Sequence, residues 1–147
     1  MILVDFKVFN AKGRLLGLDW GARRTGVAVS DETREFVFAR DPIISNTLDD
    51  LIKKVCEIIT TEKIGGIVVG LPLHMDGTDS ETTAMVRIFA DKLSHATDLP
   101  IVLIDETLSS NAAQEQMGRV RVHDIKEKLD SNAARVILEN AIAMIKR

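Results

Sequence analysis

A chain of 147 residues has the usual size of one domain, so separate catalytic and binding domains are not expected. Hydrophobic residues make up 46% and charged residues 28% of the sequence, proportions that exclude disordered, collagen-like and coiled-coil chains. The net charge of −3 is unevenly distributed, with +2 on residues 1–40, −8 on residues 41–118 and +3 on residues 119–147. The basic ends could form one positive face for a polyanion, or they could be scattered solvated charges.

The sequence shows no membrane segment. No apolar stretch approaches the length of about 20 residues that spans a bilayer, and the apolar start Met1–Val4 meets Asp5 without a cationic leader. Cys56 is the single cysteine, so no internal disulfide can form, which fits a reducing compartment. We therefore expect a cytoplasmic protein with no membrane partner.

The first part of the chain predicts an antiparallel meander. Arg14–Trp20 is an apolar run that ends in an aspartate, and the loop Gly21–Arg24 is short enough to join it to Thr25–Ser30 as a hairpin. Glu35–Arg40 is a third candidate strand before a turn expected at Asp41–Pro42.

Helical and strand patterns then alternate. Helices are expected over residues 48–59, Thr78–Ala96 and Ser109–Met117 and from Asp130 onward, and strands at Gly65–Leu71 and Ile101–Ile104. Two pairs have the spacing of helix caps, Thr47 with Asp50 and Thr78 with Glu81. Apolar faces are predicted for the second and last helices, at Met85, Ile88, Phe89, Leu93 and Ala96, and at Ala134, Ile137, Leu138, Ala141 and Ile145.

This order of elements, βββαβαβαα, predicts the fold class. It indicates an α/β fold with a mixed five-stranded sheet, made of the antiparallel meander followed by helix-linked parallel strands. Helices are expected on both faces of that sheet.

Three acidic positions lie at predicted element ends, where oxygen ligands from separate elements could meet around a metal ion. Asp19 ends the first strand, and a carboxylate in such an apolar run needs a cation or hydrogen-bond donors; an isolated Asp-x-Gly is otherwise a turn cap. Asp105 and Glu106 follow the last strand. Side chains alternate between the two faces of a sheet, so only one of these two can face the site, and Glu106 is preferred because its side chain is longer. Asp130 has, by spacing alone, the position of an N-cap.

Four segments of the chain together resemble the motifs of the YqgF/RuvX family. They are Asp19–Asp31, Gly70–Gly77, Asp105–Ser110 and Leu129–Ala134, in the family's order, and they cover the chain from Arg14 almost to its end. The resemblance implies a single ribonuclease H-like nuclease domain over residues 1–147, related to RuvC-type resolvases. It further implies a metal-dependent phosphodiester nuclease that processes the 5′ end of precursor 16S ribosomal RNA, or a Holliday junction resolvase that acts on branched DNA.

The resemblance also assigns roles to residues. It implies that Asp19, Glu106 and Asp130 are catalytic carboxylates that bind Mg²⁺ or Mn²⁺ beside a polynucleotide. The residues implied to border the substrate are Gly21, Arg24, Gly26, Gly70, Pro72, Gly77, Ser109 and Ser110. One position departs from the family's pattern, because Thr107 stands where arginine is common, and this removes a planar cation that could hold a phosphate.

Other interpretations remain open. A non-catalytic nucleic-acid or ribosome-assembly module is favoured by Thr107 and by the acidic pI of about 5.6. An actin- or sugar-kinase-like ATPase uses a similar Asp-x-Gly hairpin, but it needs two such domains and this chain has room for one. Trp20 could stack on a base, although alternation places it opposite Asp19, packed beneath the sheet. Nothing separates RNA from DNA, and the chain is expected to be a monomer or a homodimer.

Overall fold

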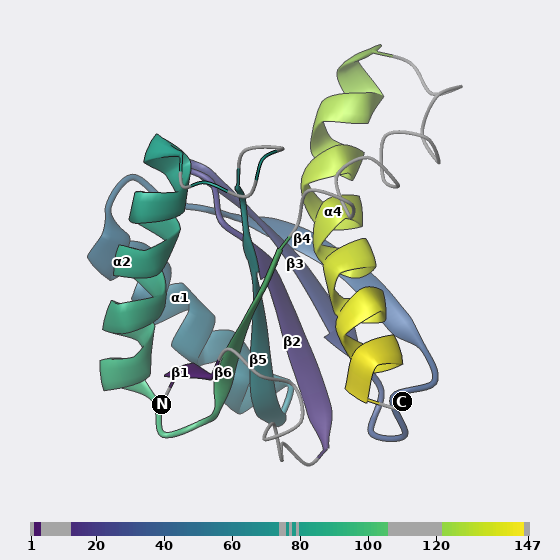
Figure 1. The fold of residues 1–147 in the computed structure, drawn as a ribbon. Helices are drawn as coiled ribbons and strands as arrows, with labels where there is room; N and C mark the ends of the chain where they lie inside the picture. The colour runs from purple at the N-terminus through teal and green to yellow at the C-terminus, as the bar shows by residue number, and fades with distance from the viewer. Residues whose placement is uncertain are drawn as a thin grey trace.

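The computed structural model describes residues 2–3, 13–73, 76, 78, 80–105 and 122–145, with only the backbone course for residues 2–3 and 122–131. In chain order the elements are β1 (Ile2–Leu3), β2 (Arg14–Asp19), β3 (Arg24–Ser30), β4 (Val37–Ile44), α1 (Leu48–Thr61), β5 (Ile64–Leu71), α2 (Glu81–Ala96), β6 (Ile101–Asp105) and α4 (Val122–Ile145). The strands form one sheet in the order β1-β6-β5-β2-β3-β4 (Figure 1).

The mixed sheet matches the sequence prediction at its centre and is one strand wider at its edge. β2, β3 and β4 form the predicted antiparallel meander, and β5 and β6 lie parallel to β2. The predicted count of five strands is wrong, because β1 adds a sixth by pairing parallel to β6. A strand of two residues is too short to show an alternating pattern, so it leaves no signal in the sequence.

β4 continues through Asp41–Pro42, so the turn predicted there is wrong. Thr25 of β3 faces Ile43 of β4, whereas Val27 faces Arg40, and two residues of β4 therefore lie opposite one residue of β3. This extra residue is a β-bulge in an edge strand, which is a place where a proline without an N–H group is tolerated.

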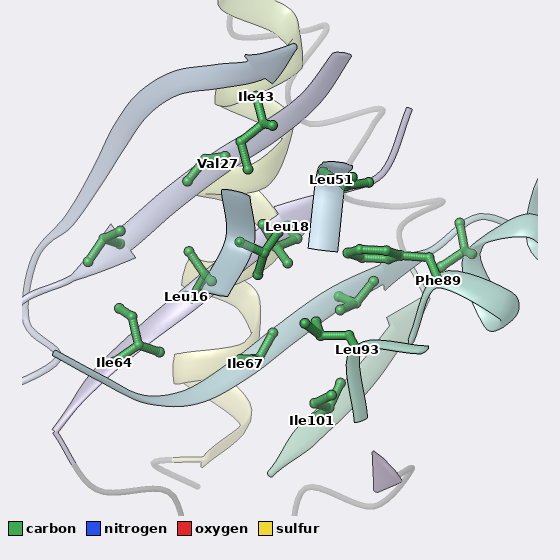
Figure 2. Packing of buried hydrophobic residues seen from close by; sticks show 14 of the residues in the cluster. Leu16, Leu18, Val27, Ile43, Leu51, Ile64, Ile67, Phe89, Leu93 and Ile101 are labelled. Carbon is green, nitrogen blue, oxygen red and sulfur yellow. The ribbon is translucent and has the colours of Figure 1, made fainter. Parts of the chain in front are cut away.

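Helices cover both faces of the sheet, as predicted. Figure 2 shows the cluster between the sheet and helices α1 and α2, in which the largest buried side chains are Leu16, Leu18, Leu51, Ile67, Phe89 and Leu93. The other face packs against α4 through Leu15, Ala28, Val68, Val102, Ile104, Ala134, Ile137 and Leu138. Successive residues of each strand belong alternately to the two clusters. The cluster that a residue joins therefore identifies its face of the sheet, and the face of any other residue in that strand follows by alternation.

The helix caps agree with the sequence for α1 and differ for α2. The Thr47 side chain accepts a hydrogen bond from the Asp50 N–H at 3.1 Å, which confirms the first predicted pair. The predicted cap at Thr78 is wrong, because α2 begins at Glu81 with Ser80 as its N-cap. Ser80 and Thr83 form a reciprocal capping box, with side-chain to backbone distances of 3.1 and 2.8 Å.

The buried face of α2 and the start of α4 both differ from the sequence prediction. Met85 and Ile88, predicted on the buried face of α2, are 43% and 47% exposed, and the buried face instead comprises Thr83, Val86, Phe89, Ala90 and Leu93. α4 begins at Val122, so Asp130 lies inside the helix and its prediction as an N-cap is wrong. The predicted helix Ser109–Met117 lies outside the described residues. Within the described residues, no helix is both long and apolar enough to cross a membrane.

Candidate active site

Asp19 lies at the carboxyl end of β2, where its half-buried side chain takes the α4 face of the sheet. Leu15 belongs to the cluster under α4, whereas Leu16 and Leu18 belong to the cluster under α1 and α2. Alternation along β2 gives Asp19 the same face as Leu15. Trp20 packs against the opposite cluster, which confirms the prediction that it lies beneath the sheet.

The turn that follows Asp19 is held in one conformation. A Cβ atom on Gly21 would lie 2.0 Å from the carbonyl oxygen of Arg24, so only glycine fits there. The hydroxyl of the fully buried Thr25 lies 3.5 Å from both the backbone nitrogen and the carbonyl oxygen of Gly21. These contacts fix the hairpin between β2 and β3.

Arg24 is positioned by the same hairpin. Gly26 is the cross-strand partner of Asp19, and Arg24 lies two residues before Gly26 on β3. Alternation therefore gives Arg24 the same sheet face as Asp19. The Ser45 N–H donates to the Arg23 carbonyl at 3.0 Å and ties the hairpin to the end of β4. The structure thus brings together Asp19, Gly21, Arg24 and Gly26 among the residues predicted from sequence.

The neighbouring parallel strands end at the same edge. Leu18 pairs with Val69, and Gly70 pairs with Ile104, so Asp19, Gly70 and Ile104 form one row across β2, β5 and β6. Gly70 has no side chain, so no β5 side chain separates Asp19 from β6 in this row. Ile104 belongs to the cluster under α4, the face that Asp19 takes.

The predicted acids at the end of β6 and directly after it are only partly described. Asp105, the last residue of β6, is exposed, and its neighbour two positions back, Leu103, packs against the cluster under α1 and α2. Asp105 therefore takes the face opposite to Asp19. Glu106, Gly77, Ser109 and Ser110 lie outside the described residues.

Helix α4 crosses the sheet beside Asp19. A Cβ atom on Gly17 would lie 2.9 Å from the Leu138 Cβ and 3.0 Å from the Ala134 carbonyl oxygen, so α4 rests directly on the Gly17 backbone. The first residues of α4 lie at the end of the molecule where β2 finishes (Figure 1). Asp130 is one turn before Ala134, about 6 Å along the helix axis. Asp19 is two residues beyond Gly17, roughly 7 Å along the strand, so from this contact Asp19 and the backbone of Asp130 both lie toward the same end of the sheet.

The loop after β5 is anchored beside this edge. The hydroxyl of Thr83, a fully buried residue in the first turn of α2, donates to the carbonyl of Pro72. Pro72 is half-buried, and the start of its loop is therefore held by the helix. This contact places the predicted residues Gly70 and Pro72 at the carboxyl edge of the sheet.

Sequence analysis missed a polar chain on α4. The Asn132 side-chain oxygen accepts hydrogen bonds from Arg135 Nε and Nη2 at 3.0 and 2.7 Å, and Arg135 pairs with Glu139. The Asn132 side-chain nitrogen is buried and has no hydrogen-bond partner. The spacing i, i+3 and i+7 places these three residues on one face of the helix, and this spacing is the signal that the sequence contains.

The chemistry of the predicted acids suits a hard cation. Among the described residues, no group of three His, Cys, Asp or Glu side chains could hold a metal ion. Two of the three predicted carboxylates, Glu106 and the side chain of Asp130, lie outside that set. Carboxylate oxygens are the ligands that Mg²⁺ and Mn²⁺ prefer, and the one described member, Asp19, ends a strand at the shared sheet edge.

Solved structures share this fold. RuvC of T. thermophilus, in complex with a Holliday junction substrate, aligns with a TM-score of 0.55 over 89% of this chain and 94% of its own, at 11% identity. The fowlpox virus resolvase, in complex with Holliday junction DNA, gives a TM-score of 0.52 over 90% of this chain and 99% of its own, at 10% identity. The expected ribonuclease H-like α/β fold is confirmed.

Sequence comparisons identify the family. The RuvX model, described as Holliday junction resolvase, matches residues 13–144. A protein of Maridesulfovibrio salexigens named "Putative pre-16S rRNA nuclease" is 44% identical over 132 residues, 88% of this chain and 98% of its own. A protein of the same name from Orientia tsutsugamushi is 37% identical over 144 residues, 95% of this chain and 90% of its own. Because these matches cover nearly the whole sequence, the chain belongs to the RuvX family.

Proposed function

We propose that this chain is a one-domain, metal-dependent nuclease, spanning residues 1–147, that hydrolyses a phosphodiester bond at the 5′ end of precursor 16S rRNA in the cytoplasm. The proposal is supported by the contact of α4 with Gly17, from which Asp19 and the backbone of Asp130 both lie toward the carboxyl edge of the sheet. A metal-dependent site would need these two acids, which come from elements far apart in the chain, to meet there.

Three carboxylates would complete the site. Asp19, Glu106 and Asp130 would hold Mg²⁺ or Mn²⁺, which when bound would supply charge stabilisation and an activated water. Arg24, on the Asp19 face of the sheet, would bind a phosphate of the substrate. Gly26 has no side chain, so the polynucleotide would be able to approach its backbone closely, whereas Gly21 would shape the turn beside it.

The choice of RNA rests on the relatives. The proteins at 44% and 37% identity are both named for precursor 16S rRNA, whereas the resolvases solved with Holliday junctions share 11% and 10% identity. Cleavage of branched DNA is therefore the second candidate. A non-catalytic assembly module is the third, since Thr107 replaces the common motif arginine.

A matched cleavage assay tests the proposal. Wild type, Asp19→Asn, Glu106→Gln and Asp130→Asn are assayed on precursor rRNA ends and on four-way DNA junctions, with Mg²⁺ or with excess EDTA. We expect wild type to cleave the RNA only with the metal, and each substitution to reduce the rate at least about 100-fold. Asp91→Asn, at an exposed position of α2, is the matched control and should keep the wild-type rate.

Three outcomes contradict parts of the proposal. Undiminished cleavage in EDTA would show that the reaction needs no metal ion, and an unchanged rate in Asp19→Asn would show that this carboxylate has no part in it. Faster cleavage of the four-way junction than of the RNA would make junction cleavage the favoured function. Binding of RNA without any cleavage by wild type would identify the assembly module instead.

A further inference from the structure

The outer edge of the sheet carries a concentrated set of exposed apolar side chains. Phe36, Phe38 and Ile44 are 61%, 48% and 51% exposed, and all three lie on β4 or directly before it. β4 is the last strand in the sheet order, so no strand of the described chain covers its outer edge. An exposed apolar edge strand is a template for pairing with another strand.

Only part of β4 is available for regular pairing. The bulge at Asp41–Pro42 ends the regular ladder, because proline has no N–H to donate. Beyond the bulge, Lys54 Nζ donates to the Ile44 carbonyl at 2.7 Å and occupies that acceptor. The regular stretch therefore runs over Val37–Arg40.

We propose that this stretch pairs antiparallel with the same stretch of a second copy of this chain, about a two-fold axis at Ala39. In an antiparallel pair, residues directly opposite one another have side chains on the same face of the sheet. A symmetric pair therefore needs its axis at a residue position, not between two residues, because only then do opposite residues share a face.

Charge excludes Arg40 as the position of the axis. An axis there would set the Arg40 side chain against its own copy in the partner subunit. Like charges directly opposite in a sheet are destabilising. The axis at Ala39 places no two like charges opposite one another.

The same axis pairs an aromatic ring with a cation. It sets Phe38 opposite Arg40 of the partner subunit. Within one chain, the Arg40 guanidinium already lies 5.8 Å from the centroid of the Phe38 ring, and the axis would repeat this cation–π contact across the interface. At the axis, Ala39 is exposed and small, and it continues the row that runs through Gly17 and Ala28 in register. The two sheets would then become one continuous sheet.

Sedimentation measurements on the full-length protein test the dimer. Wild type should sediment as a dimer at micromolar concentrations, and Ala39→Lys should raise the dissociation constant at least tenfold, because two ammonium groups would meet at the axis. Ile88→Lys adds the same charge at an exposed position of α2 and should leave the dissociation constant unchanged. A wild type that stays monomeric at high micromolar concentrations, or an equal dissociation constant for Ala39→Lys, would overturn the proposal.

A cysteine cross-link tests the axis itself. Ala39→Cys in a Cys56→Ser background should form an intermolecular disulfide on mild oxidation, because directly opposite residues have Cα atoms about 4.5–5.5 Å apart, within the range for a disulfide. Ile88→Cys in the same background is the control, and it should cross-link at least tenfold more slowly. Equal rates for the two variants would overturn the axis at Ala39, even if Ala39→Lys fails to fold.

Discussion

At the scale of single residues, the distance between α4 and the sheet depends on the missing side chain at Gly17. The nearest atoms to a Cβ placed there belong to Leu138 and to the backbone of Ala134, and backbone atoms cannot rotate away. The same contact fixes where α4, the helix that contains Asp130, crosses β2, the strand that contains Asp19.

Gly17→Ala tests this dependence. The added methyl group would overlap with Leu138 and Ala134, so we expect the free energy of unfolding to fall by about 1–3 kcal/mol, measured by urea denaturation. Ala143→Ser, which adds one atom at an exposed position of α4, should change it by less than about 0.5 kcal/mol. An unchanged urea midpoint for Gly17→Ala would show that α4 can move away from β2 without cost.

Asp31 organises the turn between β3 and β4. Its carboxylate accepts a hydrogen bond from the Thr33 hydroxyl, and its Oδ1 accepts the backbone N–H groups of Glu35 and Phe36, both at 2.9 Å. These hydrogen bonds, with that of Thr33 the largest cause, lower the pKa of the Asp31 carboxyl below its usual 3.8. Because the pKa is lower in the folded state, the ionised carboxylate stabilises the fold at neutral pH.

The stabilisation by Asp31 should disappear in acid. It is fully present above the unfolded pKa near 3.8 and is lost as the pH falls through the lower folded pKa. Asp31→Asn should therefore lower the urea midpoint at pH 7, and the difference from wild type should shrink toward pH 3. A difference that stays constant between these pH values would refute the role of the charge.

At the scale of elements, caps decide where a helix begins and packing against the sheet decides which of its side chains are buried. The capping box of Ser80 and Thr83 starts α2 after the position expected from Thr78, and the face of α2 that packs on the sheet leaves Met85 and Ile88 exposed. Thr78 instead binds Asp76 through its N–H and hydroxyl, at 3.0 and 2.6 Å. Both threonine and serine fit the local spacing, so the spacing alone does not choose between them.

Two alanine substitutions distinguish the caps. Ser80→Ala should lower the free energy of unfolding by about 1 kcal/mol, because the Thr83 N–H loses its acceptor at the start of α2. Thr78→Ala removes only exposed hydrogen bonds and should cost less than about 0.5 kcal/mol. Urea denaturation of both variants measures the difference, and an equal loss in the two would contradict Ser80 as the N-cap.

At the scale of the whole molecule, the candidate site is formed by residues from elements that are distant in the sequence. β2 contains Asp19, β5 has no side chain at Gly70, and α4 contains Asp130 in the part of the helix toward the same end of the sheet. Gathered carboxylates repel one another unless a cation lies between them. Metal binding should therefore couple to the stability of the folded chain.

Thermal unfolding measures that coupling. A metal that binds only the folded state stabilises it by about 2.7 kcal/mol at a concentration 100 times its dissociation constant, so Mg²⁺ should raise the Tm of wild type. Asp19→Asn should lose this increase, and in EDTA it should be at least as stable as wild type, because one like charge is removed. The exposed control Asp91→Asn should keep the increase. An equal Mg²⁺ effect in Asp19→Asn would place the metal elsewhere.

The sequence by itself determined the features that depend on neighbours along the chain. Alternation in the first apolar run placed Asp19 and Trp20 on opposite faces, and the short loop after it predicted the hairpin that the structure contains. The order of strands and helices likewise predicted the mixed sheet with helices on both faces. These features depend on the spacing of side chains within short segments, so they can be predicted without knowing how the segments pack.

Only the tertiary structure decided the features that depend on residues far apart in the sequence. The start of α4 at Val122 makes Asp130 an internal helical residue and not a cap, and the contact with Gly17 sets where α4 crosses β2. The pairing of β1 with β6 and the bulge in β4 also depend on neighbouring strands, and the spacing of residues within a single strand does not predict which strands these are. Strand register and helix docking are set by packing between distant segments, so they become visible only when those segments meet.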